Sequence, residues 1–438
     1  MGELVFEWPW WMHPVWAVLL VTGATATVSV LLPQASYATW RTPRYLSGDN
    51  SVLLMIGISS LLLGLLLASA RVLRSGSVRI AFSTMQLQFL RRAYWVLLTL
   101  VAVGYVAWIA SAASQGASFE ALLSVVSREE GAVSQLKADS RPIGGVTTLT
   151  QFGPLLVVLG VCLRRLGQVG RWHYLVVVMA AMRGIFYAER LALLEVLIPA
   201  LVVIGSLAYG SRRRVLFLRM APLIVVPVGV AFFAVFEYFR SWVYYQTVVS
   251  LPFGEWVALR MLGYYVTSYN NSALLNDLLS GQTQTAPVFS VPFLYNAPLI
   301  GDLLPQPRIG GQSADGWWSW VLKNYANPEF TNGGSFLLIN GEFGTPAMIV
   351  YWLITGIIVG SIYAAMRRGS FAAVLAYTCI FVGLLELPRF IYWIQGRSIP
   401  LVLGILFIAV AYALVTKRDE RASRLRKRWG STREAQVV

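Results

Sequence analysis

The feature that most constrains the fold is a series of apolar runs, each roughly 18–25 residues long, repeated along the sequence. A helix of this length crosses the hydrocarbon core of a bilayer. Hydrophobic residues make up 57% of the chain and charged residues only 13%, whereas soluble domains carry about 25% charged residues. The sequence therefore predicts an all-α polytopic membrane protein.

We expect about ten membrane-spanning helices, in a single transmembrane domain over residues 1–438. The N-terminus lacks the basic region of a signal peptide, so we expect the first helix to be retained. The fifth and sixth are close enough to form a tight hairpin. The ten ranges are 11–32, 51–70, 93–113, 148–163, 172–187, 190–209, 220–239, 346–366, 371–391 and 399–416.

Basic residues mark the orientation of the chain. They cluster in alternate loops and in a basic tail at 417–438, and such loops are usually cytoplasmic. This distribution places both termini of a multi-pass membrane protein in the cytoplasm. It also accounts for the formal net charge of +15 without nucleic-acid binding. The clustered loops lie at 71–92, 164–171, 212–219 and 367–368.

One long polar segment, 240–344, interrupts the apolar pattern between the seventh and eighth helices. Loops of this length are usually functional, and we interpret this one as an extracytoplasmic subdomain. Residues 255–279 show helical spacing, whereas the Pro/Gly-rich stretch that follows favours irregular structure. A smaller outer loop, 114–147, carries apolar residues at helical spacing and predicts an amphipathic helix on the membrane surface.

Charges inside the apolar runs are the strongest candidates for function, because each costs about 2.5–3.5 kcal/mol at the centre of a membrane. The predicted hairpin contains Arg183, Glu189, Arg190 and Glu195. These residues form either a structural Arg–Glu network or a site for a lipid-linked phosphate or diphosphate, which guanidinium groups bind well. Near the end of the ninth apolar run, Arg389 follows Glu386 and Pro388 at the same predicted membrane level.

The long polar segment supplies further candidates. Arg240, Arg260 and Arg308 are its candidate anion-binding residues, and Tyr264 and Tyr265 suit stacking on sugars. Aromatic residues here are also typical of a membrane boundary. Asn270 and Asn271 suit sugar hydroxyls or any wet interface.

Several kinds of site are not indicated. The only histidines, His13 and His173, lie near the predicted cytoplasmic face, so no outer histidine is available as a base. No acidic or His/Asp/Glu cluster predicts a metal, and no motif predicts a nucleotide cofactor. Cys162 and Cys379 lie in apolar runs and do not indicate a disulfide framework.

The segment from Asn332 to Gly344 and the apolar run after it resemble bacterial Wzy-type polymerases of O-antigen and capsule repeat units. The segment begins with a polar stretch that precedes an aromatic residue. Small residues follow, and then an acidic residue, an aromatic residue and a glycine. An apolar run that contains glycines comes after them. The short hairpin with Arg190 and the late Arg389 also resemble that family. The matching residues of the segment are Asn332, Ser335, Phe336, Glu342, Phe343, Gly344, Gly356 and Gly360.

The resemblance implies a metal-independent enzyme that joins polyprenyl-diphosphate-linked oligosaccharides into a surface polysaccharide at the outer face of a bacterial cytoplasmic membrane. It implies Arg190 and Arg389 as catalytic residues, with Glu342 as the base and Glu189 or Glu329 as substitutes. Substrate binding would fall to Arg183, Arg240, Arg260, Arg308, Tyr264, Tyr265 and Asn332. A flippase and a chain-length regulator are further candidate partners, and Glu342 is equally explained as an acid at a helix start.

Two other functions remain open. A different glycosyltransferase, using a polyprenyl-phosphate sugar, would carry acidic residues in its first outer loop, where Asp49 stands alone. A transporter or flippase of lipid-linked glycans would be polar along the full depth of the bundle, whereas the predicted buried charges cluster at one level. The lack of an outer histidine favours a polymerase over the related O-antigen ligases.

Overall fold

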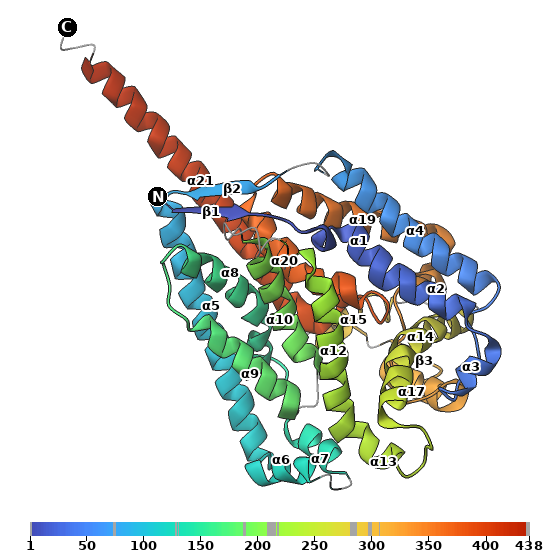
Figure 1. Cartoon of the computed structure of the whole chain (residues 1–438). Coiled ribbons are helices and arrows are strands. Elements are labelled where there is room, and N and C mark those ends of the chain that lie inside the picture. The colour runs from blue at the N-terminus through green and yellow to red at the C-terminus, as the bar shows by residue number, and fades with distance from the viewer. Residues whose placement is uncertain are drawn as a thin grey trace.

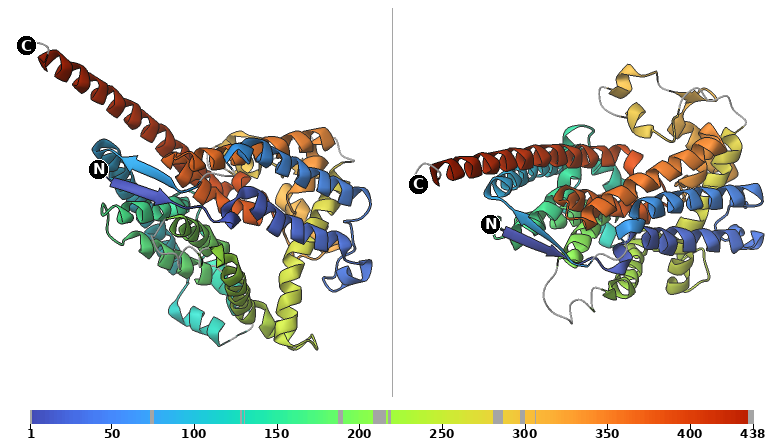
Figure 2. Two further views of the ribbon diagram at one scale, coloured as in Figure 1. Left: turned by 45° about the horizontal axis from the view of Figure 1, so that its top comes forward. Right: turned by 90° about the horizontal axis from the view of Figure 1, so that it is seen from above.

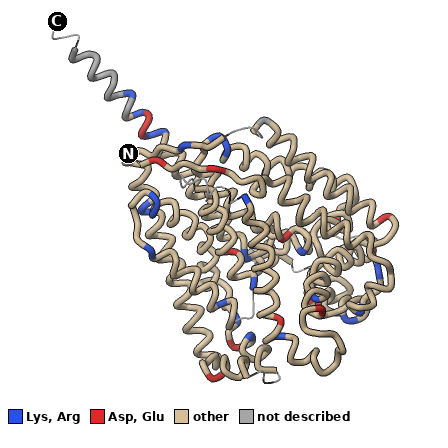
Figure 3. Tube along the Cα trace, in the orientation of Figure 1, with Lys and Arg blue, Asp and Glu red and all other residues tan. Residues whose placement is uncertain are grey.

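The computed structural model describes residues 2–72, 76–127, 129, 131–186, 190–207, 216, 219–280, 287–296, 300–305 and 307–434. The chain is mostly helical, with two small two-stranded sheets (Figure 1). Long stretches of the helices carry no charge (Figure 3). These observations confirm the prediction of an all-α membrane protein.

Seven helical segments of the described residues are long and apolar enough to cross a membrane. Two shorter apolar helices and α10 coincide with the three remaining predicted ranges. The seven are Pro14–Leu31 (α1 Pro14–Ala17, η2 Val18–Gly23, α2 Ala24–Leu31), α4 (Asp49–Ser69), α5 (Thr84–Ser114), Val146–Arg165 (η4 Val146–Phe152, α8 Gly153–Arg165), Ala221–Tyr245 (α12 Ala221–Glu237, η5 Tyr238–Trp242, α13 Val243–Tyr245), α19 (Thr345–Arg367) and Gly396–Ala422 (η7 Gly396–Ser398 and part of α21, Ile399–Glu434). The other three are α9 (His173–Phe186), α10 (Arg190–Ser206) and α20 (Phe371–Glu386).

Helix α8 lies at the centre of one group of helices. Its residues from Gly153 to Leu163 are all buried, and it packs against α5, α9, α10 and α20. This burial explains why its sequence is apolar on every side.

Helices α4 and α19 pack closely against each other and lie side by side (Figures 1 and 2). A Cβ atom added at Gly64 would clash with the carbonyl oxygen of Leu353, and one added at Gly356 with that of Leu61. Small residues at a helix crossing let two membrane helices approach closely. Gly356, one of the residues that carries the family resemblance, therefore has a packing role.

The polar segment between α12 and α19 contains one long helix, α14 (Phe253–Leu279), as the spacing over 255–279 predicts. Its residues from Val266 to Asn276 are all buried. The Tyr269 hydroxyl donates a hydrogen bond to the carbonyl of Thr22 in η2 at 3.1 Å. Part of this segment thus packs inside the helix bundle.

A chain of asparagine side chains anchors α14. Asn340 donates to Asn276 at 2.6 Å, Asn276 donates to Asn50 at 2.9 Å, and Asn50 donates to Asp277 at 2.9 Å. Buried amides need such partners, because an unsatisfied polar group costs about 1–3 kcal/mol. The chain ties α14 to the start of α4 and to α18 (Phe336–Phe343).

Asn270 and Asn271, the candidates for sugar binding, also have structural partners. Asn270 Oδ1 accepts a hydrogen bond from the Tyr45 amide at 2.7 Å, and Asn271 donates to the carbonyls of Phe330 and Asn332 at 2.7 and 3.0 Å. Both side chains are buried. They therefore hold backbone segments in place instead of facing a wet interface.

The remaining elements are short. Strand β1 (Gly2–Phe6) pairs antiparallel with β2 (Val78–Phe82), a sheet that the sequence analysis did not predict. The segment 114–147 forms two helices, not the single predicted one, and Gly131 begins the second with a left-handed φ of 81°. The others are α3 (Gln34–Ala38), α6 (Phe119–Val126), α7 (Ala132–Asp139), α15 (Pro292–Asn296), α16 (Ile300–Leu303), β3 (Arg308–Ile309), β4 (Gln312–Ser313) and α17 (Ala314–Tyr325).

Helix α21 extends beyond the other helices (Figure 1). The basic cluster at 212–214 and the side chains after Arg424 lie outside the described residues.

Candidate functional site

A cavity of about 1060 Å³ opens between α10, α12, α14, α20 and the segment 329–334. One part is apolar and is walled by α10 and α12. The other part is lined by Arg190, Arg240, Arg389 and Arg397, with Tyr264 and Tyr265 of α14. A cavity that joins an apolar part to several guanidinium groups suits a ligand with an apolar body and an anionic group.

Arg190 begins α10 and reaches across to α12. Its Nη2 donates to Glu237 Oε1 at 2.9 Å, and its guanidinium carbon lies 4.4 Å from the ring centroid of Phe233 and 5.3 Å from that of Tyr264. Its Nη1 atom is buried and has no hydrogen-bond partner among the described residues. Glu237 therefore fixes the Nη2 side of the guanidinium, whereas its Nη1 atom can still donate hydrogen bonds.

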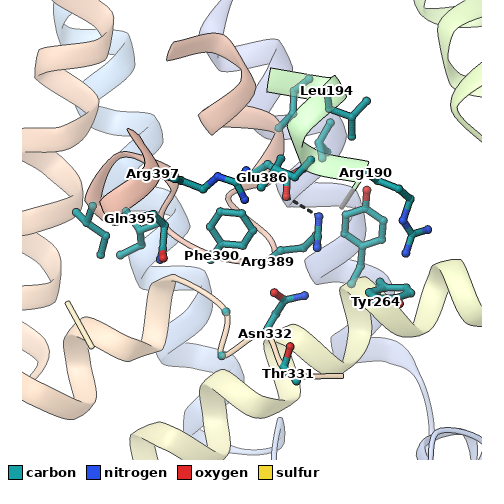
Figure 4. A pocket seen from close by; sticks show the side chains of 18 of the residues that line it. Arg190, Leu194, Tyr264, Thr331, Asn332, Glu386, Arg389, Phe390, Gln395 and Arg397 are labelled. Carbon is teal, nitrogen blue, oxygen red and sulfur yellow. Dashed lines mark hydrogen bonds and ion pairs between the residues drawn. The ribbon is translucent and has the colours of Figure 1, made fainter. Parts of the chain in front are cut away.

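Arg389 approaches the same tyrosine from the end of α20. Its Nη1 donates to Glu386 Oε2 at 2.8 Å, as the three-residue spacing predicts, and its guanidinium carbon lies 5.9 Å from the Tyr264 centroid. Figure 4 shows this pair, with Arg190 and Tyr264 on one side of Arg389 and Arg397 on the other.

Three buried donors thus gather around Tyr264. Arg190 Nη1, Arg389 Nε and the Tyr264 hydroxyl have no hydrogen-bond partner in the part of the chain that the structure describes. A buried donor without a partner loses its hydration without compensation. An oxyanion that accepts from these donors would offset that cost. Because Arg190, Arg389 and Tyr264 line one cavity, they favour an anion site there.

A buried row of alternating charges supports Arg190. Glu237 is fully buried and accepts from Arg190 and from Arg260 Nε, the second bond being 3.2 Å long. Arg260 Nη1 in turn donates to Glu329 Oε2 at 2.5 Å, and the Tyr245 hydroxyl also donates to Glu329. We call Arg190, Glu237, Arg260, Glu329 and Tyr245 the charge row.

Arg260 therefore lies beside the cavity and not in it. It does not line the cavity, and both of its described ion pairs point along the charge row. This placement does not support its predicted contact with substrate and makes it a support for Glu237 and Glu329. Its guanidinium lies within 5.2–5.9 Å of four aromatic ring centroids, those of Tyr245, Trp256, Tyr264 and Phe330.

Glu329 ends the charge row and lines the cavity. Burial alone would raise the pKa of its carboxyl group, but the hydrogen bonds from Tyr245 and Arg260 outweigh burial and lower that pKa below its usual 4.5. Glu329 is therefore an ionised hydrogen-bond acceptor at neutral pH.

Three other predicted residues line the cavity. Arg240 is exposed at its edge, Tyr265 faces it from α14, and Asn332 contributes from the segment after α17. The structure therefore brings seven of the predicted residues to one cavity: Arg190, Arg240, Tyr264, Tyr265, Glu329, Asn332 and Arg389.

Glu342 does not reach this cavity, because its carboxylate holds a backbone turn. Its Oε1 accepts from the Phe289 amide at 2.7 Å and its Oε2 from the Ser290 amide at 3.0 Å. Burial raises the pKa of Glu342, against the effect of these hydrogen bonds. The position corrects the expectation of a base at Glu342 and gives that residue a structural role.

Two predicted arginines also lie elsewhere. Arg183 is buried in α9, where its Nη1 donates to Thr150 Oγ1 at 2.7 Å. Arg308 is exposed on β3, and neither residue lines the cavity. Glu189, a substitute candidate for the base, lies outside the described residues.

Arg397 lines the cavity, although the sequence analysis did not single it out. It forms a two-bond pair with the buried Glu195 of α10, at 2.7 and 3.0 Å. The sequence did contain a signal for Arg397: it is a basic residue in a loop that the bias of basic residues assigns to the outer side, where such residues are fewer. Glu195 thus pairs with a residue that is distant in the sequence.

No group of three metal-ligating side chains occurs among the described residues. Comparison of the chain with protein-family models, with curated proteins and with solved structures finds no match.

Proposed function

We propose that the protein is a membrane glycosyltransferase that polymerises polyprenyl-diphosphate-linked oligosaccharide repeat units. The observation that carries the proposal is a cavity in which an apolar part meets four arginines, Arg190, Arg240, Arg389 and Arg397, beside buried donors that have no described partner. A lipid diphosphate combines the two properties that such a cavity suits, an apolar chain and a dense anionic group. The resemblance of residues 332–344 to Wzy-type polymerases supports the same function.

In the proposed reaction, a sugar hydroxyl of one repeat unit attacks the anomeric carbon of a second glycan. A carbon–oxygen bond forms, the bond from the anomeric carbon to the diphosphate breaks, and polyprenyl diphosphate leaves with the electron pair. Arg190 and Arg389 stabilise the negative charge that grows on the leaving diphosphate. Arg240 and Arg397 lie in the same cavity and offer further positive charge.

The proton of the attacking hydroxyl needs an acceptor. Glu329 replaces Glu342 in this role, because Glu329 lines the cavity and is ionised. Glu386 also lines the cavity, but its carboxylate accepts the hydrogen bond that positions Arg389. Tyr265 and Asn332, with Trp318 of α17, lie where a glycan would extend from the diphosphate.

The proposed topology has ten membrane-spanning segments, the seven long helices together with α9, α10 and α20. Both termini lie in the cytoplasm, and the arginines of the cavity lie near the outer leaflet of a bacterial cytoplasmic membrane. This arrangement follows the bias of basic residues toward alternate loops. It places the segments 114–147 and 240–344 on the outer side.

Replacement of Arg190 or Arg389 by alanine tests the proposal in cells that make the polysaccharide. We expect loss of polymer and accumulation of single lipid-linked repeat units at the outer face. Arg308→Ala is the matched control, because Arg308 is an exposed arginine outside the cavity. Unchanged polymer length in the Arg190/Arg389 double variant would contradict the proposal, and repeat units retained inside would indicate a transporter.

A further inference from the structure

We infer that the apolar part of the cavity is a lateral slot that holds the first stretch of the lipid chain and that opens to the bilayer beside α12. The inference rests on the proposed anion site and names the part of the protein that would hold the rest of the ligand. The proposed occupant of the slot is the apolar chain attached to the diphosphate.

The two walls of the slot are facing stripes of α10 and α12. On α10, cavity residues recur every third or fourth position from Leu191 to Val202, and on α12 they recur in the same way from Pro222 to Phe233. This spacing is one face of each helix. Ala17, Leu20 and Val21 close a third side.

Helix α12 is separated from the bundle along most of its length. Among its residues, all of which the structure describes, only Glu237 is buried. Leu223, on a face away from the slot, is 66% exposed. A helix with apolar residues on both faces, one toward a cavity and one outward, suits a wall between a lipid-filled slot and the bilayer.

Gly229 marks open space in this wall. It lines the cavity, and a Cβ atom added there would meet nothing within 4 Å. Glycine inside a helix costs about 1 kcal/mol relative to alanine, and here no packing contact requires it. The absence of a side chain keeps the slot wide at its middle.

The length of the slot fits one leaflet. Arg190 and Leu201 both line the cavity, and the eleven steps of α10 from one to the other correspond to about 17 Å. Half of a hydrocarbon core of about 30 Å is about 15 Å. The unpartnered donors lie at the Arg190 end, so an anionic group there would place the chain along the slot, with any excess length in the bilayer.

A photolabelling experiment tests the slot directly. The full-length protein in lipid nanodiscs is exposed to a farnesyl diphosphate analogue with a photoreactive group at the chain end, and labelled residues are located by mass spectrometry. We expect labels on the slot-facing residues of α10 and α12. Excess undecaprenyl diphosphate should displace the label, whereas excess phosphatidylglycerol should not.

Substitutions that fill the slot supply the second measurement. Gly229→Trp should reduce labelling by about tenfold or more, the effect of overpacking a cavity of fixed width. Leu194→Trp on the opposite wall should do the same, and Ile224→Trp on the outward face of α12 should not. Calorimetric binding of inorganic pyrophosphate should be unchanged in all three, which shows that the proteins are folded.

Three results would overturn the slot. They are equal labelling of the Ile224 face, displacement by phosphatidylglycerol as effective as that by undecaprenyl diphosphate, and full labelling in both slot-filling variants. Displacement by the phospholipid would mean that bulk lipid occupies the slot. These results distinguish the slot from the proposed reaction. Labelling as expected by a protein that does not polymerise glycan would refute the polymerase alone. Full polymerisation by the Gly229→Trp protein would refute the slot alone.

Discussion

The charge row makes Glu237 the residue whose loss should most disturb the site. Glu237 is fully buried and accepts hydrogen bonds from both Arg190 and Arg260. The substitution Glu237→Gln keeps its shape and one acceptor oxygen. It removes the negative charge between two guanidinium groups and turns an amide donor toward one of them.

The size of the effect follows from these partners. Removing one member of a buried ion pair costs about 3–5 kcal/mol, because the other charge stays buried. Arg260 keeps its bond to Glu329 at 2.5 Å, so we expect the lower end, about 3 kcal/mol. Arg190 loses its only described ion pair, and its guanidinium should leave its position beside Tyr264.

Thermal unfolding of the purified protein, followed by tryptophan fluorescence, measures this cost. At about 2 °C for each kcal/mol in a large chain, the midpoint should fall by roughly 6 °C. Glu255→Gln is the control, because Glu255 is exposed on the same polar segment, and surface changes usually stay within about 0.5 kcal/mol. Equal midpoints for Glu237→Gln and the wild type would refute the charge row as a stabilising unit.

Three further predictions concern single residues. Gly356→Leu should destabilise the protein by about 1–3 kcal/mol or more, because the new side chain would clash with the backbone of α4. Gly254→Leu is the control: Gly254 has open space around it, so this change should cost at most about 0.5 kcal/mol. Unfolding midpoints of the two variants measure the difference. Because the pKa of Glu329 is lowered in the fold, its charge stabilises the protein above the usual carboxyl pKa, and this contribution disappears as pH falls through the lowered value. The stability gap between wild type and Glu329→Gln should therefore be full at neutral pH and shrink below about pH 4.5, and a constant gap would contradict the assignment. Asn276→Ala should lower stability by about 1–3 kcal/mol by leaving the amides of Asn340 and Asn50 without their partner, and an unchanged denaturation midpoint would show that the asparagine chain is dispensable.

The apolar helices and α14 were predictable from the sequence because their signals are local. Apolar length marks the membrane helices, and helical spacing marks 255–279. The depth of α14 was not predictable, because Asn270, Asn271 and Asn276 are polar residues whose partners come from distant segments. The sheet of β1 and β2 is equally non-local, since it joins residues 2–6 to residues 78–82.

In the candidate site, too, the sequence predicts what depends on local signals and not what depends on distant partners. The cost of charge in apolar runs singles out Arg190 and Arg389, and the structure brings both to Tyr264. Sequence spacing cannot tell which arginines line a cavity, so Arg183, which bonds to Thr150 outside it, gave the same signal as Arg190. Glu342 was selected by its neighbours in a motif, whereas its oxygens are occupied by the backbone of residues 289–290.

The most direct test of the central claim is polymerisation by the purified protein. The protein would be incubated with a polyprenyl-diphosphate-linked repeat unit, without nucleotide sugar and with a chelator present, and the products would be separated on a gel. We expect the wild-type protein to give a ladder of lengthening glycans and to release polyprenyl diphosphate. The Arg190→Ala protein should do neither. A single unextended band with the wild-type protein, or a ladder of equal intensity with Arg190→Ala, would contradict this expectation.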